Sequence, residues 1–243
     1  MTAIQTVNLT KKFKDKTAVN SLNLVIEQGE LFALLGVNGA GKTTTIKMLS
    51  CLTAPTNGDA ILLGDSILTQ AQAVKEKINV SPQETAVAPN LTVRENLDLI
   101  AKIYGDNNSA VKKTEEMLTA FNLQEVAKDK AKTLSGGMQR RLSIAMALIS
   151  EPQILFLDEP TLGLDVLARR ELWKEIQKLK GNITIILTTH YLEEAEALSD
   201  RIAIMSKGEL KAVGTAKELM DKTGTDKLED AFVALAAGEG VER

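Results

Sequence analysis

The sequence has one cysteine, one histidine and no long apolar run in its 243 residues. Because Cys51 is alone, the chain has neither a disulfide framework nor a zinc site made of several thiolates. No apolar run approaches the ~18 residues that a membrane span needs, and no stretch resembles a signal peptide. We therefore expect the chain to have no membrane span of its own and to act at a membrane only through a partner.

An excess of positive charge is also missing, since the net charge is -3 and the pI is near 5.5. No nucleic-acid partner is expected, because nucleic-acid-binding proteins present basic surfaces. The one basic run, "KKFKDK" at 11–16, is most simply a solvated loop, although its lysines are able to touch phosphates. With 44% hydrophobic and 25% charged residues, the composition is that of a globular protein.

Short apolar runs alternate with amphipathic helical patterns along the chain. Near-continuous apolar runs at 31–36, 153–159, 183–190 and 201–206 are typical of strands buried on both faces of a parallel sheet. Helical patterns cover about 42–52, 93–103, 110–121, 136–150, 166–179 and 191–198. This alternation predicts an α/β core. The range 86–140 has helices without a convincing strand and is interpreted as an inserted helical subdomain, and the end, 238–243, is expected to fray.

The stretch "GVNGAGKTT" (36–44) matches the phosphate-loop pattern G-x-x-x-x-G-K-[ST] between a predicted strand and a predicted helix. Gly36, Gly39 and Gly41 allow backbone N–H groups to curl around an anion at the start of the helix. Lys42 is expected to bind the β- and γ-phosphates, and the hydroxyl of Thr43 to ligate Mg²⁺. The alternative, an ordinary glycine-rich turn, does not require this strand-to-helix context.

Two carboxylates end the apolar run "ILFLDE" (154–159). Asp158 is expected to contact Mg²⁺ through water or through another ligand of the ion, and Glu159 to polarise the attacking water. An alternative is that the pair caps the turn before Pro160. His190 ends another predicted strand at the same sheet edge, where its imidazole can donate a hydrogen bond to charge that develops on the γ-phosphate. A lone histidine is otherwise more often structural.

Two further features lie near the helical insert. Gln83 follows the short strand "INVS" and is a candidate ligand of Mg²⁺ or water through its amide oxygen. In "LSGGM", Ser135 is a good N-cap, yet Gly136 and Gly137 each weaken a helix by about 1 kcal/mol relative to alanine. Such a start exposes backbone N–H groups as a weak anion site. One strong and one weak phosphate site in a chain suggest that the two meet across two copies.

These motifs, in this order, resemble the ATP-binding cassette (ABC) family of transporter ATPases over nearly the whole chain. The resemblance implies a P-loop NTPase (RecA-like) α/β fold with an N-terminal antiparallel β region and an inserted α-helical subdomain. It divides one ABC ATPase domain, 1–243, into an α/β core (1–85 and 141–222), the helical subdomain (86–140) and a C-terminal helix and tail (223–243).

The resemblance also implies ATP and Mg²⁺ as cofactors. Phe13 would stack on the adenine, although it is alternatively a core phenylalanine, and Val19 would line the same base. Ser135, Gly136 and Gly137 would complete the ATP site of the opposite subunit, and Asp165 in "LGLD" would lie at the dimer seam. The implied site residues are Glu159, His190 and Lys42 for catalysis; Phe13, Val19, Gly36, Asn38, Gly39, Ala40, Gly41, Lys42, Thr43 and Thr44 for ATP; and Thr43, Gln83 and Asp158 for the metal.

The implied partners are integral-membrane permease subunits and a second ATPase subunit, identical or related, at the cytoplasmic face of the membrane. Exposed residues from Glu84 to Asn96 are candidates for contacting the permease. The motifs are most similar to a branch of mostly exporters, although Met138 replaces the usual glutamine. A soluble cassette of DNA repair or translation is an alternative, but the chain has no heptads between Gln83 and Ser135 and only one cassette. An inactive, binding-only cassette is another, but its catalytic residues are all present.

Overall fold

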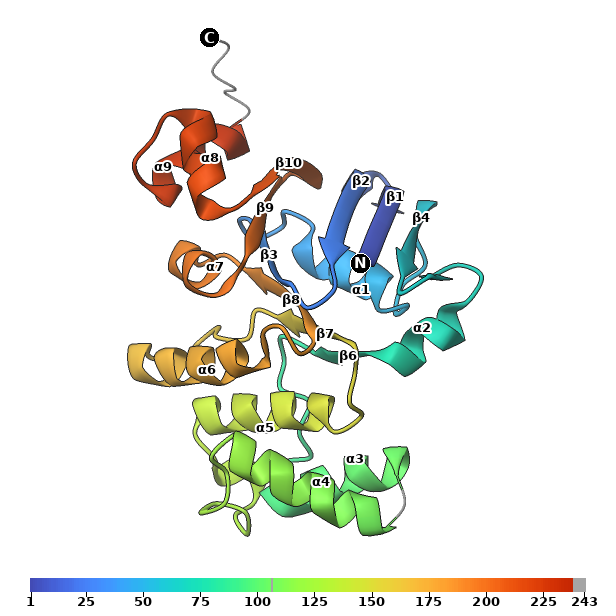
Figure 1. Cartoon of the computed structure of the whole chain (residues 1–243), viewed down its shortest axis with the longest axis vertical. Helices are drawn as coiled ribbons and strands as arrows, with labels where there is room; N and C mark the ends of the chain where they lie inside the picture. The colour runs from blue at the N-terminus through green and yellow to red at the C-terminus, as the bar shows by residue number, and fades with distance from the viewer. Residues whose placement is uncertain (106, 238–243) are drawn as a thin grey trace.

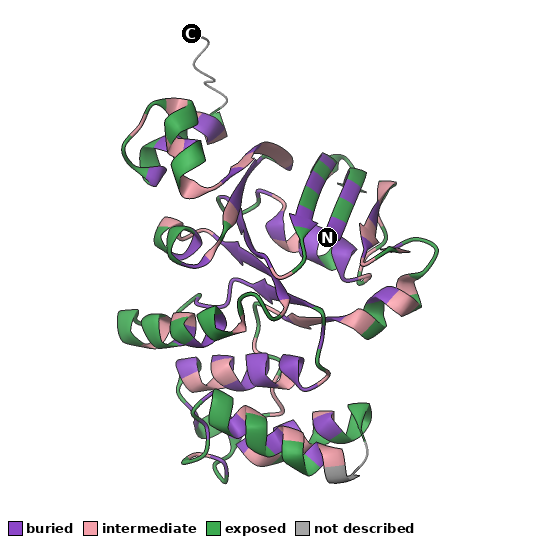
Figure 2. Ribbon diagram, viewed as in Figure 1, coloured by how far each residue is buried: buried purple, intermediate pink, exposed green. Residues whose placement is uncertain are grey.

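The computed structural model describes residues 1–105 and 107–237. A six-stranded sheet in the order β10-β9-β3-β8-β7-β6 crosses the middle of the molecule (Figure 1). Its strands are β3 (Leu31–Leu35), β6 (Ile78–Ser81), β7 (Ile154–Asp158), β8 (Thr184–Thr189), β9 (Arg201–Ser206) and β10 (Glu209–Gly214). All pairs are parallel except β9–β10. The strands predicted from apolar runs are confirmed, and the strands β3, β7 and β8 are buried at every position (Figure 2).

A second, antiparallel sheet lies beside the first and has the order β2-β1-β4-β5. Its strands are β1 (Thr2–Phe13), β2 (Lys16–Glu27), β4 (Asn57–Leu62) and β5 (Asp65–Ser66). Buried side chains of this sheet share one apolar cluster with α1 (Lys42–Leu49) and one face of the six-stranded sheet. The N-terminal antiparallel region is therefore confirmed, and it covers one side of the phosphate loop. The short helix α2 (Ala71–Lys77) leads from it to β6.

Helices form a separate layer below the sheet in Figure 1. They are α3 (Val93–Tyr104), α4 (Asn107–Ala120) and α5 (Gly136–Leu148), with a single 3₁₀ turn at Ala131–Thr133. One apolar cluster joins Leu97 of α3, Leu118 of α4 and Leu142 of α5 to the underside of β7. The described part of 86–140 contains no strand, only an isolated bridge between Thr92 and Lys130. Because α5 runs across position 140, the division into subdomains there stays a prediction.

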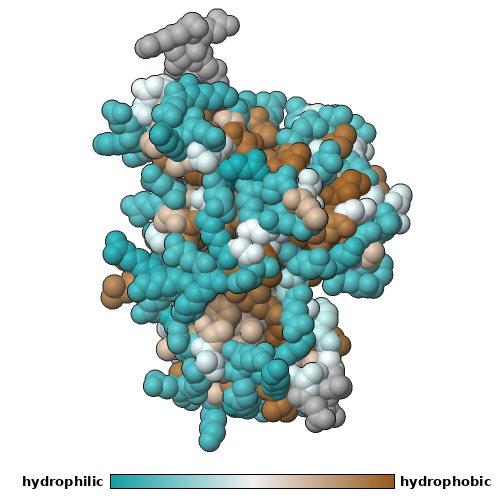
Figure 3. Space-filling model, viewed as in Figure 1, coloured by the Kyte–Doolittle hydropathy of each residue, from teal (hydrophilic) through white to brown (hydrophobic). Residues whose placement is uncertain are grey.

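The remaining helices are α6 (Val166–Leu179), α7 (Leu192–Leu198), α8 (Ala216–Thr223) and α9 (Leu228–Ala237). Helices α7, α8 and α9 bury a third apolar cluster against β3 and β9. Hydrophilic residues cover most of the face in Figure 3, and apolar residues gather where the helical layer meets the sheet. No helix in the described part of the chain combines the length and apolar content needed to cross a membrane. The predicted frayed end, 238–243, lies outside the described residues.

Candidate active site

A pocket of about 510 Å³ opens at the carboxyl edge of the six-stranded sheet, where ligands of α/β sheets bind. It is lined by Phe13, Lys16, Ala18, Asn38, Gly39, Ala40, Gly41, Lys42, Thr43, Thr44, Gln83, Glu159, Leu162 and His190. Most of the residues predicted from the motifs are thus brought together. Lys16, Ala18 and Leu162 also line the pocket. Lys16 belongs to the basic run 11–16 and Leu162 to "LGLD", but neither was predicted as a nucleotide contact, and Ala18 had no distinguishing motif.

The glycines of the loop have different structural roles. Gly41 has a φ of 105° and is the N-cap of α1, and a Cβ there would lie 2.5 Å from the carbonyl oxygen of Ala18. A Cβ on Gly36 would lie 2.5 Å from the carbonyl oxygen of Met205, so Gly36 packs the loop onto β9 and is not among the pocket-lining residues. The N-terminus of α1, with its free N–H groups, therefore opens towards the pocket.

The carboxylate of Glu159 contacts the side chains of Lys42 and His190. Its Oε1 is 3.3 Å from Nζ of Lys42, and its Oε2 is 3.0 Å from Nδ1 of His190. Lys42 is only 4% exposed and also donates to the carbonyl oxygens of Gly36 at 2.8 Å and Val37 at 3.3 Å. The groups predicted to bind and hydrolyse the γ-phosphate are therefore within direct contact of one another.

The backbone at Glu159 is unusual, since its φ is +47°. This left-handed conformation costs a non-glycine residue on the order of 1–3 kcal/mol. Two contacts to β8 hold it: the Glu159 N–H donates to the hydroxyl of Thr188 at 3.0 Å and to its carbonyl oxygen at 3.1 Å. The turn directs the carboxylate back towards Lys42.

Of the predicted metal residues, Thr43 and Gln83 line the pocket, whereas the buried Asp158 does not and contacts Thr43. Oδ1 of Asp158 accepts hydrogen bonds from the hydroxyls of Thr43 at 3.1 Å and Thr188 at 2.5 Å. Hydroxyl and carboxylate oxygens suit Mg²⁺, which usually completes its shell with water and substrate phosphates. Among the described residues there is no group of three or more His, Cys, Asp or Glu side chains that could hold a metal. The donor set therefore fits Mg²⁺ only together with a phosphate.

The predicted adenine end is only partly supported. Phe13 is 51% exposed, lines the pocket and has the ammonium of Lys11 5.1 Å from its ring centre, so it is not a core residue. Val19 is fully buried in the apolar cluster. Because side chains alternate along a strand, its neighbour Ala18 lines the pocket instead. The structure thus does not place Val19 at the nucleotide.

Ser135, Gly136 and Gly137 of "LSGGM", here called the signature segment, lie outside the pocket. Ser135 is exposed and its hydroxyl accepts from the Met138 N–H at 3.3 Å as the N-cap of α5. Gly136 is exposed, whereas a Cβ on Gly137 would lie 3.1 Å from that of Ala168. The close packing of α5 on α6 therefore explains why position 137 is a glycine. This packing could not be predicted from the sequence.

Asp165 has a role within its own helix. Its Oδ1 accepts from the N–H groups of Leu167 and Ala168, both at 2.9 Å, so it is the N-cap of α6. It is exposed.

Arg140 is a site residue that the sequence analysis missed. Only 4% exposed, its guanidinium donates to the carbonyl oxygens of Pro82 at 2.5 Å, Gln83 at 2.6 Å and Glu159 at 3.4 Å. Burial lowers the pKa of Arg140, and the charge of Asp158 opposes this shift. The arginine thus joins α5 to both the Gln83 loop and the end of β7. The only signal in the sequence was a charged residue on the face of α5 that the apolar pattern predicts to be buried.

Comparisons with known proteins agree with this geometry. Residues 19–162 match the family model described as "ABC transporter". The chain is 41% identical to the linearmycin resistance ATP-binding protein LnrL of Bacillus subtilis, covering 93% of this chain and 73% of that protein. It is 41% identical to the Nod factor export ATP-binding protein I of Burkholderia lata, covering 91% and 74%. The dimeric ATP-binding cassette MJ0796, solved in a post-hydrolysis state with ADP and Pi, superposes with a TM-score of 0.78 at 27% identity, covering 87% and 98%.

Proposed function

The chain belongs to the ABC transporter family as an ATP-binding, ATP-hydrolysing subunit. From this premise we propose which residues bind ATP and which hydrolyse it. The loop 36–44 and the N-terminus of α1 bind the phosphates of ATP. Lys42 exchanges its contact with Glu159 for the γ-phosphate, which carries more charge. Glu159 then accepts a proton from the water that attacks γ-phosphorus, as the bond to the β-phosphate breaks. His190 donates a hydrogen bond to the γ-phosphate oxygens.

Thr43 and Asp158 would hold Mg²⁺ together with the phosphates, and Gln83, on the pocket wall, would contact it or the water. The ion would neutralise charge on the β- and γ-phosphate oxygens during transfer. Phe13, which is exposed and lines the pocket, would stack on the adenine.

We further propose that Ser135, Gly136 and Gly137 complete the ATP site of a second ATPase subunit. Their absence from this chain's own pocket lining and the exposure of Ser135 and Gly136 support this arrangement. The dimeric state of the similar cassette also supports it. A second copy of this chain and a related cassette both satisfy the geometry.

The permease would dock beside Gln83. A groove of about 170 Å³ there is lined by Asn79, Val80, Pro82, Ala86, Ile100, Tyr104, Ser143, Met146 and Ala147. Next to it, α3 exposes the apolar side chains of Leu99 and Ile103. Asn96 is fully buried and bonded to the backbone of Ala88, so it falls outside the contact surface expected from Glu84 to Asn96. This docking would place the chain at the cytoplasmic face of a membrane, and the names of its relatives favour export.

The observation that carries the proposal is the Glu159 carboxylate in contact with both Lys42 and His190 at the floor of the phosphate-loop pocket. In Glu159→Gln, steady-state ATP hydrolysis is expected to fall at least about 100-fold, because the general base is lost. ATP binding should persist, and a dimer should accumulate on size exclusion with ATP. Glu125→Gln, at an exposed loop position, is the matched control. Hydrolysis at the native rate by Glu159→Gln contradicts the assignment of the base.

A further inference from the structure

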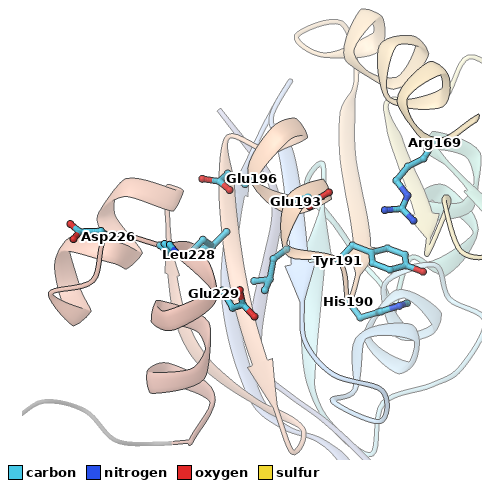
Figure 4. A pocket seen from close by; sticks show the side chains of 10 residues that line it. Arg169, His190, Tyr191, Glu193, Glu196, Asp226, Leu228 and Glu229 are labelled. Atoms are coloured by element: carbon cyan, nitrogen blue, oxygen red, sulfur yellow. The ribbon is translucent and has the colours of Figure 1, made fainter. Parts of the chain in front are cut away.

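A second cavity, of about 580 Å³, lies on the other side of His190, between α7 and the C-terminal helices. In Figure 4, Leu228 and Glu229 of α9 face it from one side, and Tyr191 and His190 from the other. Its lining is Arg169, His190, Tyr191, Leu192, Glu193, Glu196, Asp226, Lys227, Leu228 and Glu229. The nucleotide pocket uses only His190 of this set, so most of the cavity has no role in the proposed hydrolysis.

The cavity has an excess of acidic side chains. Its four carboxylates, those of Glu193, Glu196, Asp226 and Glu229, are all exposed, and none forms an ion pair within the described residues. Two basic side chains also line it. One of them, Arg169, lies with its guanidinium carbon 4.4 Å from the ring centre of Tyr191 (Figure 4). The cavity therefore presents negative charge beside apolar Leu192 and Leu228, with four carboxylates against two basic side chains.

A surface complementary to the cavity lies at the start of α6, the helix that also carries Arg169 of the cavity lining. At the start of α6, Val166 is 62% and Leu167 is 74% exposed, and Arg170 is exposed one turn further on. Positions 166, 167 and 170 share one helix face. Arg170 forms no ion pair within the described part of the chain. We call Val166, Leu167 and Arg170 the α6 patch. It is apolar and basic, where the cavity is apolar and acidic.

We propose that the α6 patch of one copy docks into the acidic cavity of a second copy of this chain, and the reverse, when two copies close on ATP. The inference rests on the proposed function, because it deepens the dimer proposed there. A two-fold axis makes every contact twice, so if the α6 patch of one copy meets the cavity of the other, the reverse contact forms as well. The cavity and the nucleotide pocket share His190. The contact between the two copies would therefore lie next to the phosphates of bound ATP.

The contact is tested in the Glu159→Gln background with ATP, by sedimentation velocity over a range of protein concentrations. Arg170→Glu removes the basic group of the patch, and the double change Glu193→Lys with Glu229→Lys reverses the cavity. Each is expected to raise the dimer dissociation constant at least about tenfold, since opposed charges are replaced by like charges. Combining all three changes should recover most of the loss. Lys75→Glu, on exposed α2 at the opposite side of the molecule in Figure 1, should leave it unchanged.

ATP binding by the monomer and the melting temperature are measured for each variant, so that unfolding is not mistaken for lost docking. The docking proposal is overturned if the parent dimerises with ATP while the Arg170 and cavity variants dimerise equally well. It is overturned, too, if the combined variant is no tighter than the weaker of its two components. If the parent itself stays monomeric with ATP, the proposed dimer fails, and the docking surface with it.

Discussion

At the scale of single residues, Asp158 ends β7, Glu159 follows it and His190 follows β8, so the three lie at one edge of the parallel sheet. This common edge was predictable, because the apolar runs of both strands predict the parallel sheet. That Glu159 contacts Lys42 depends on a positive φ of +47°, which no local propensity favours in a glutamate. Val19 is fully buried while its strand neighbour Ala18 lines the pocket, so a contact of Val19 with the nucleotide stays a prediction.

Glu194, directly behind the His190 loop, gives a test at this scale. It is fully buried on α7, and its Oε1 accepts from Nε1 of Trp173 on α6 at 3.0 Å. Burial raises the pKa of Glu194, and the nearby hydroxyls of Thr189 and Thr161 and the hydrogen bond from Trp173 partly oppose this shift. Between its unfolded and its higher folded pKa, the native state holds a proton that the unfolded state has lost. Stability therefore falls as pH rises through that window.

Glu194→Gln removes this titration but can still accept from Trp173 through its amide oxygen. We expect the melting temperature of the variant, relative to the native protein, to rise between pH 4.5 and pH 8. Glu193→Gln, exposed on the same helix, should show no such trend. Parallel melting curves for Glu194→Gln and the native protein across this range would mean that the burial of Glu194 does not govern its protonation.

At the scale of elements, continuous apolar runs predicted the buried strands, and 3.6-residue periodicity predicted α1 and α3 to α7. Strands β1 and β2 alternate buried and exposed positions with bulges between them, so their pattern was too irregular to show from composition, and only the family resemblance implied them. The short helix α2 buries a single residue, Val74, which leaves little periodic signal. The hydrogen bonds of Arg140 to the Gln83 loop could not be predicted from the sequence, because their acceptors are backbone carbonyl oxygens 57 and 58 residues away.

Arg140 should be required for the joint between α5, the Gln83 loop and β7. Arg140→Lys keeps the charge but loses the planar fork that contacts several carbonyl oxygens at once. We expect the free energy of unfolding, measured in urea, to fall by about 1–3 kcal/mol, because buried acceptors lose a charged donor. Arg94→Lys, at an exposed pair with Glu115, should change it by less than about 1 kcal/mol. If both substitutions lower the free energy of unfolding equally, Arg140 does not stabilise the contact between α5, the Gln83 loop and β7.

At the scale of the whole molecule, one chain holds a complete phosphate loop and carries its signature segment on a different layer. Lys42 and Glu159 lie in the pocket at the sheet edge, whereas Ser135 starts α5 and is exposed. The order of the motifs predicted both the phosphate loop and the signature segment. Their separation in space could not be predicted from sequence spacing, because it depends on how the helical layer packs against the sheet. The central claim is therefore that two chains make each working site.

Mixing two inactive variants tests this claim most directly. Lys42→Ala removes ATP binding but retains the signature segment, and Ser135→Arg retains the phosphate loop but blocks the signature. Each alone should be inactive, while heterodimers in an equal mixture hold one intact composite site. The account predicts that ATPase activity of the mixture recovers to as much as about a quarter of the native value, since half the dimers carry one of two sites. Native turnover by Ser135→Arg alone, or a mixture as inactive as its components, would contradict it.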